Sequence, residues 1–256
     1  MKKILLIALV FGILISCKKK KNGEEPSTDP VTITPTNPPA PVLPVTIPAD
    51  ADGVLMASEI GYEFGNGYVT RLGKASAFFY TSPGNYNYVD AGTVLCKDSL
   101  LAKISGSYYF GGKPINGQPY SGINYAAGST WSVSGTTSVP TFTYATSTFP
   151  SIGALTSGTL ISKTSPYTAT FSGATNADSV VVMLTGDSVL VQKKTVLASS
   201  GSCTFSAAEI GKVKKQVSGV FPSLHIISYT IFANTVSAKK YYMVNSNTNT
   251  YRINTF

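Results

Sequence analysis

The sequence is poor in the side chains that catalysis and metal binding need. It has 256 residues but one histidine, three cysteines and only 12% charged residues, against about 25% in an average soluble protein. A serine hydrolase needs a histidine base beside its nucleophile, yet the single His225 lies in an apolar strand-like run and no Gly-x-Ser-x-Gly motif is present. One histidine and distant cysteines supply no transition-metal motif. We therefore predict no catalytic residue, no metal and no cofactor.

The charges that are present show no pattern typical of nucleic-acid binding or glycoside hydrolysis. The formal net charge is +8, but the lysine pairs beyond residue 50 are scattered and form no basic stripe interleaved with aromatic residues. The nearest acidic pair, Glu59 and Glu63, has Gly61 between its members and lies near the end of a strand-like run. We predict no nucleic-acid partner and assign no catalytic carboxylates.

The chain begins with a pattern typical of a lipoprotein export signal. Two lysines precede an apolar run over residues 4–15, which is shorter than the roughly 20 residues of a membrane-spanning helix. The run ends in four residues that resemble the bacterial lipobox, namely Leu14, Ile15, Ser16 and Cys17. In that motif a peptidase cuts before the cysteine, and the cysteine carries the lipid. The resemblance implies a signal peptide over residues 1–16 and membrane attachment through Cys17.

If Cys17 carries a lipid, two cysteines remain. Cys96 and Cys203 lie 107 residues apart in sequence. One alternative is a disulfide, which an oxidising compartment permits. The other, which we favour, is that each is buried separately as a small apolar side chain.

Residues 17–50 form a predicted disordered tether rich in proline and threonine. Eight of the fifteen prolines lie between residues 18 and 50, and proline favours extended polyproline II, so this segment can reach on the order of 100 Å at about 3.1 Å per residue. Four lysines, residues 18–21, follow the predicted lipid. They are either a solvated charge run or contacts to anionic headgroups, each stabilising by about 1 kcal/mol.

Beyond Val54 the chain consists of short runs rich in Val, Tyr, Phe and Thr, separated by Gly, Pro, Asn and Ser every eight to twelve residues. This spacing is typical of antiparallel β structure. One series of runs ends near residue 150 and a second begins at Gly158, which indicates a boundary near 150. The predicted fold is all-β, with two tandem antiparallel, immunoglobulin-like β-sandwich modules over 51–150 and 151–256; a single sandwich is the alternative. The predicted strands are 54–60, 75–80, 86–96, 107–110, 130–134, 141–145, 158–162, 167–172, 179–184, 188–192, 203–206, 224–232, 239–244 and 250–255.

Two local patterns in the second module are sharper than the rest. Ser206 and Glu209 have the spacing of a capping box, and Ile210, Val213 and Val217 follow at helical intervals. We predict a short helix of at most three turns, whose place between two strands resembles the connection between the sheets of immunoglobulin-like sandwiches. The continuous apolar run over 180–184 predicts a core strand.

Aromatic residues are unevenly distributed, because ten of the fifteen tyrosines lie between Tyr62 and Tyr144. One interpretation is a flat face on which sugar rings stack, with neighbouring polar groups fixing their orientation. The alternative is that tyrosine suits any half-buried pleated surface. The candidate ligand face consists of Tyr86, Tyr88, Tyr108, Tyr109 and Trp131.

The lipobox, the lysine-rich start with Glu24 and Glu25, the Pro/Thr tether and the tyrosine-rich strands together resemble small lipoproteins of Bacteroidota. In that group, acidic residues soon after the lipidated cysteine mark export to the cell surface. Lys18 differs from the aspartate that retains lipoproteins in the inner membrane of many Gram-negative bacteria. The resemblance implies attachment to the outer membrane, with the surface and periplasmic faces both open.

We therefore predict a lipid-anchored envelope protein that presents β-sandwich modules for binding or adhesion, with a glycan or an envelope protein as partner and without catalysis. Two alternatives remain: a structural or assembly subunit of the envelope, and a hydrolase with an unrecognised site.

The lipobox generates a direct test. Cys17→Ser should abolish membrane association, because acyl chains, and not the β modules, would hold the protein at the membrane. Membrane fractionation with a carbonate wash measures this. A variant that still sediments with washed membranes would show that the lipobox interpretation is wrong.

Overall fold

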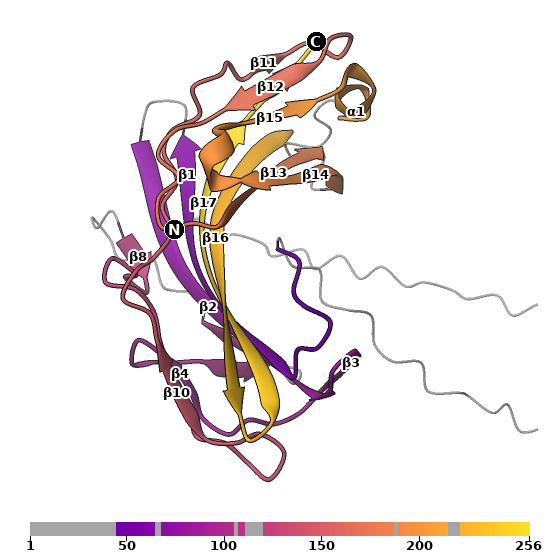
Figure 1. The fold of residues 1–256 in the computed structure, drawn as a ribbon. Coiled ribbons are helices and arrows are strands. Elements are labelled where there is room, and N and C mark those ends of the chain that lie inside the picture. The colour runs from indigo at the N-terminus through magenta and orange to yellow at the C-terminus, as the bar shows by residue number, and fades with distance from the viewer. Residues whose placement is uncertain (1–44, 65–67, 105–106, 111–119, 187–188, 215–220) are drawn as a thin grey trace, which may run out of the picture. The chain divides into compact units, whose positions relative to one another are not determined.

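A computed structural model describes residues 45–64, 68–104, 107–110, 120–186, 189–214 and 221–256, all of which belong to one compact unit (Figure 1). The predicted signal, the lipobox and most of the predicted tether lie outside these residues. The described chain is mostly strand with one short α-helix, which confirms the all-β class. None of its helices is long and apolar enough to cross a membrane.

The largest sheet has ten strands, in the order β14-β13-β16-β17-β1-β2-β7-β6, with β3 and β8 also paired to β2. Two long hairpins, β1–β2 and β16–β17, form its centre (Figure 1). The strands are β1 (Gly53–Phe64), β2 (Tyr68–Ser82), β3 (Asn85–Tyr88), β6 (Ala102–Ile104), β7 (Ser107–Phe110), β8 (Tyr120–Gly122), β13 (Ser179–Gly186), β14 (Val189–Leu197), β16 (Ser223–Val236) and β17 (Lys239–Arg252).

The pairing of β1 with β17 joins the two predicted halves of the chain. It runs from Gly53 opposite Tyr241 to Tyr62 opposite Thr250, and it is parallel. The predicted modules on either side of residue 150 therefore share this sheet, and its pairing is not antiparallel throughout. The long connection between β1 and β17 permits either direction, and neither periodicity nor turn chemistry identifies a partner so distant in sequence.

Three smaller sheets accompany the large one. Their orders are β10-β9-β4-β5, β11-β18 and β12-β15. Their strands are β4 (Val94–Cys96), β5 (Ser99–Leu100), β9 (Thr130–Val133), β10 (Phe142–Ala145), β11 (Leu160–Ile161), β12 (Tyr167–Thr170), β15 (Ser202–Phe205) and β18 (Asn254–Thr255).

One face of the large sheet carries two separate hydrophobic cores. The first core lies between the four-stranded sheet and the β1–β2 hairpin, where Trp131 and Val133 meet Leu55 and Phe79. The second core lies where β12 and β15 pack on β13 and the far end of the β16–β17 hairpin, and it includes Phe205 and Ile226. Because side chains alternate along a strand, residues such as Val54 and Val181 point to the opposite face and form a third cluster.

Packing against that third cluster begins before the predicted end of the tether. Val45 is buried in the cluster. Further along, the Asp50 carboxylate accepts a hydrogen bond from the Tyr242 hydroxyl at 2.7 Å, and the Asp52 carboxylate accepts one from the Lys240 backbone N–H at 2.8 Å. The segment from Val45 to Asp52 is therefore fixed to β17.

Several local predictions are confirmed. The Ser206 hydroxyl accepts from the Glu209 backbone N–H, and the Glu209 carboxylate accepts from the Ser206 backbone N–H, so the capping box is complete. The helix it starts, α1 (Ala207–Gly211), is shorter than the three turns allowed, and Ile210 and Val213 are buried in the second core. The predicted Val217 contact lies outside the described residues.

The predicted core strand over 180–184 falls within β13, between β14 and β16, and is confirmed. Cys96 is buried in the first core and Cys203 in the second, and both are free. Separate burial of the two cysteines is thus confirmed.

The predicted strand over 86–96 is divided into β3 and β4, because the chain leaves one sheet for another at Asp90. The Asp90 carboxylate accepts hydrogen bonds from the Tyr108 hydroxyl at 2.7 Å and the Gly92 backbone N–H at 2.9 Å, and pairs with Lys103 at 2.6 Å. Gly92 has φ +74°, and a Cβ there would lie 2.6 Å from the Gly135 carbonyl oxygen. Asp90 thus fixes a turn in which position 92 must be glycine, because its φ is positive and there is no room for a Cβ.

Asp90→Asn should make the protein's stability less sensitive to acid. The Lys103 and Tyr108 hydrogen bonds hold the pKa of Asp90 well below its usual range. A carboxyl whose pKa is lowered by folding stabilises fully above its unfolded pKa of about 3.9, and this contribution is lost as the pH falls through the folded pKa. Urea unfolding should therefore show a wild-type advantage at pH 7 that shrinks below pH about 4. Parallel pH profiles for the two proteins would contradict this assignment.

Candidate functional site

A band of polar side chains separates the two cores on their shared face of the large sheet. Along β17, apolar Met243 and Tyr251 point to this face, and between them the same positions hold three asparagines. The polar belt, as we call it, consists of Glu59, Arg71, Ser228, Thr230, Asn245, Asn247 and Asn249. Most of these side chains are buried, so each polar group needs a hydrogen-bond partner.

Asn245 at one side of the polar belt holds the chain as it leaves the first core. Its Nδ2 donates to the Thr146 hydroxyl at 3.0 Å and to the Thr148 carbonyl oxygen at 3.4 Å. Its Oδ1 accepts from the Ser129 hydroxyl at 2.8 Å. The nitrogen and the oxygen of the Asn245 amide therefore both hold this part of the chain against β17.

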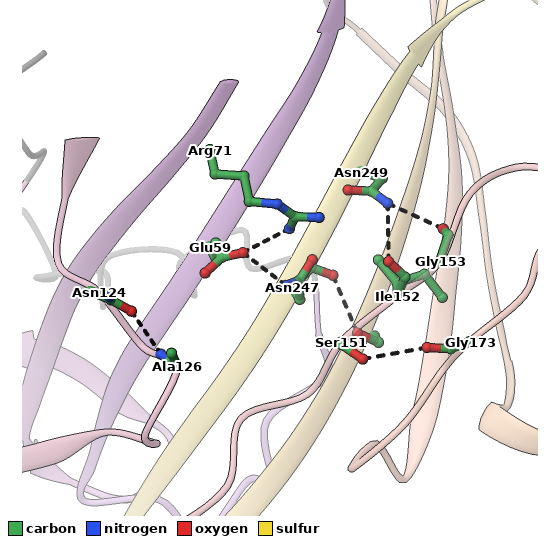
Figure 2. Close-up of polar contacts among 11 residues, drawn as sticks. Glu59, Arg71, Asn124, Ala126, Ser151, Ile152, Gly153, Gly173, Asn247 and Asn249 are labelled. Carbon is green, nitrogen blue, oxygen red and sulfur yellow. Dashed lines mark hydrogen bonds and ion pairs between the residues drawn. The ribbon is translucent and has the colours of Figure 1, made fainter. Parts of the chain in front are cut away.

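Asn249 holds the same segment on the other side of the polar belt. Its Nδ2 donates to the carbonyl oxygens of Ile152 and Gly153, each at 3.2 Å (Figure 2). Residues 146–153, the crossing segment, thus pass from the first core to the second between two asparagine contacts. The predicted module boundary near residue 150 falls inside this segment.

Glu59, Arg71 and Asn247 form the centre of the polar belt. One Glu59 carboxylate oxygen accepts from Arg71 Nη1 at 2.7 Å and from Asn247 Nδ2 at 3.2 Å. The Glu59 side chain is 9% exposed, whereas that of Arg71 is 31% exposed. Arg71 therefore compensates a buried negative charge from a position that solvent reaches. Asn247 Oδ1 is buried and has no hydrogen-bond partner among the described residues.

A cleft of about 240 Å³ opens where the polar belt meets the crossing segment. Drug-sized ligands occupy pockets of about 300–1,000 Å³, so this cleft suits a smaller group. Arg71 is the one charged residue among its described lining residues. The cleft is lined by Gly61, Arg71, Ile152, Gly153, Ala154, Asn249, Thr250 and Tyr251.

A second cleft, of about 420 Å³, lies at the β4–β5 turn and the loop after β8. Its described lining residues offer a lysine and small polar groups, but no arginine that is paired with a buried carboxylate. It is lined by Lys97, Ser99, Gly122, Ile123, Asn124, Ala126 and Ala127.

His225 does not line the cleft, although it neighbours the lining residue Thr250, and both of its ring nitrogens are engaged. Its Nδ1 is 3.0 Å from the Thr250 hydroxyl and its Nε2 is 3.2 Å from the Thr185 hydroxyl. Burial lowers the pKa of His225, which favours the neutral ring. Among the described residues, no three His, Cys, Asp or Glu side chains are grouped to hold a metal ion.

The predicted aromatic face is divided by the fold. Trp131 and Tyr108 are buried in the first core, so neither is available to a ligand there; the prediction for these two is corrected. Alternation along β9 and β7 directs their side chains to the interior. Tyr86 and Tyr88 do lie together on β3, with ring centroids 5.3 Å and 6.1 Å from that of Tyr80.

The ligand role of Tyr86 and Tyr88 stays a prediction. The side chain of Tyr109 lies outside the described residues, as does that of Glu63. The sequence interpretation missed Arg71 and the asparagines entirely. An asparagine at every second position from 245 to 249 was the available signal, since period two places all three on one face of a strand.

The ion pair between Glu59 and Arg71 predicts that substitutions of these two residues have non-additive effects on the free energy of unfolding. Arg71→Met should destabilise the protein by about 1–3 kcal/mol, because the buried Glu59 carboxylate loses its charged partner. Adding Glu59→Gln to that variant should restore part of the loss. Urea unfolding of the wild type, both single variants and the double variant measures the coupling. Simple addition of the two single effects would show that the pair is not coupled.

Comparison with known proteins assigns no family or activity to this cleft. No protein-family model matches the chain, and no curated protein is detectably similar to it. A functional interpretation therefore depends on geometry: a small cleft with one arginine, one asparagine and backbone groups, beside the crossing segment between two cores.

Proposed function

We propose that the chain is a lipid-anchored protein of the bacterial envelope that binds a saccharide, without reacting with it, in the cleft beside Arg71 and Asn249. The observation that carries this proposal is the cleft itself. It combines hydrogen-bonding groups from two strands and the crossing segment, and its apolar wall includes the mostly buried Tyr251. A few convergent polar groups beside an apolar wall are typical of small-ligand sites.

The polar groups of the cleft suit the hydroxyls of a sugar, which both donate and accept. The guanidinium of Arg71 only donates, and the side-chain oxygen of Asn249 only accepts. Asn249 Nδ2 is held by the crossing segment, and its oxygen points away from that segment (Figure 2). A donor and an acceptor are thereby placed on neighbouring sides of one cleft, and its volume suits a single ring.

Three observations support binding without catalysis. Both ring nitrogens of His225 lie within hydrogen-bond distance of threonine hydroxyls. Burial raises the pKa of the Cys96 thiol to about 12 and raises that of Cys203, so neither is a thiolate near neutral pH. Glu59 accepts from Arg71 and Asn247 in the polar belt. These groups are engaged in structure and not poised to transfer protons.

The envelope location rests on the sequence. Cys17 would carry the lipid, with attachment to the outer membrane, and the proline-rich segment would hold the folded part away from the headgroups as far as Val45. In place of two separate immunoglobulin-like modules, this proposal has two sandwich-like cores that share the β16–β17 hairpin. The ligand cleft lies between these cores.

Filling the cleft should abolish saccharide binding. Ala154 is an exposed lining residue, so Ala154→Trp should block the cleft without altering either core. Ala127→Trp is the matched control, because Ala127 is also exposed and lines the second cleft. On a glycan array, the wild type and Ala127→Trp should give the same positive set and Ala154→Trp none.

Two outcomes would contradict the proposal. Silence of the folded wild type across the array, with partner proteins still recovered from envelope extracts, would favour the structural or assembly role. Reproducible hydrolysis of a bound glycan, lost in Glu59→Gln, would favour the hydrolase.

A further inference from the structure

We infer that the cleft selects a sugar unit that carries a carboxylate, and that Arg71 is the residue that determines this specificity. The inference rests on the proposed function, since it names the class of saccharide that the same cleft would bind. It depends on the donors of Arg71 for which the described residues supply no acceptor, on the position of Glu59 behind it, and on the acceptor that Asn249 places nearby.

Arg71 has more donors than its partners use. A guanidinium carries five N–H groups, and Glu59 accepts from one of them, on Nη1. No other described residue accepts from Arg71. In Figure 2 the second terminal nitrogen is turned away from Glu59, toward the strand that carries Asn249. Among the described residues, at least one N–H on each terminal nitrogen therefore remains without an acceptor, and such a pair can bind both oxygens of a carboxylate side by side.

Glu59 prepares Arg71 for this role. Because Glu59 is buried and also accepts from Asn247 at 3.2 Å, it holds the guanidinium in one orientation before any ligand arrives. Pre-ordering lowers the entropic cost of binding, and the planar fork of arginine suits a carboxylate better than the point charge of lysine. A ligand carboxylate on the cleft side would have the guanidinium between it and Glu59, so that one cation separates two anions.

The rest of the cleft distinguishes an acidic sugar from a bare carboxylate. The Asn249 oxygen is an acceptor for a ring hydroxyl. Tyr251 lines the cleft but is buried in the second core, so it offers a ligand little aromatic surface. Among the described lining residues there is no carboxylate to repel the ligand. A small organic acid would use only Arg71, whereas a sugar acid would use Arg71 and Asn249 together.

The experiment compares uronic acids with their own methyl esters. The purified protein is titrated calorimetrically with glucuronic and galacturonic acid oligosaccharides and with the same compounds methylated at the carboxyl group, which keeps the ring and removes the charge. The wild type should bind at least one acid about tenfold or more tightly than its ester. Arg71→Lys, which keeps the positive charge beside Glu59, should lose most of that preference.

Arg252→Lys is the matched control, because Arg252 is an exposed arginine of β17 that does not line the cleft. It should keep the wild-type preference for the acid. Urea unfolding shows that each variant is folded before it is titrated.

Equal binding of acid and ester, abolished by Ala154→Trp, would overturn the inference while the proposed function stands. A folded wild type that binds neutral glycans on the array, but neither the uronic acids nor their esters, would overturn the inference alone. Silence toward uronates and on the array would overturn both. Equal affinity for the uronates and for acetate would show that Arg71 binds any carboxylate, which also overturns selection of a sugar.

Discussion

The parallel pairing of β1 with β17 is the contact on which the rest of the structure depends. It joins two hairpins that come from opposite ends of the folded chain into one sheet. Each core then packs on a different part of the same face. Glu59 and Asn247 are direct register partners in this pairing. The centre of the polar belt, and with it the cleft beside Arg71, exists only because these two strands lie side by side.

The polar belt also determines the register of that pairing. A slip of one residue would move Glu59 to the opposite face of β1, away from Arg71 and among the apolar residues of the third cluster. A slip of two would keep it on the correct face but place it opposite Asn245 or Asn249, each of which already holds the crossing segment. Apolar side chains on both strands would tolerate such slips better, because hydrophobic contact is not directional.

Much of the local structure follows from the sequence. The strand over 107–110 and the capping box at Ser206 match the structure because each is decided by neighbouring residues. The interval between the predicted strands 239–244 and 250–255 does not match, since β17 continues through it. Asparagine is depleted in strands in general, and here tertiary hydrogen bonds of Asn245, Asn247 and Asn249 override that preference.

The candidate site was harder to predict than the strands. Tyr108 and Trp131 suit a ligand face by residue type, but their burial depends on which sheet covers them. The Arg71 contact to Glu59 requires the register of β1 and β2, and the cleft requires the crossing segment to lie over β17. These are relations between distant segments, which composition and spacing do not encode.

The place where β1 begins has a mechanical consequence. On the proposal that the chain is anchored through Cys17, any pull between a bound ligand and the membrane first meets the segment from Val45 to Asp52, which is fixed to β17, and then acts along β1. Interstrand hydrogen bonds lie across the strand direction, so the load shears the ladders with β2 and β17 together instead of opening one bond at a time. The sheet that forms the cleft would then also give the protein its resistance to mechanical unfolding.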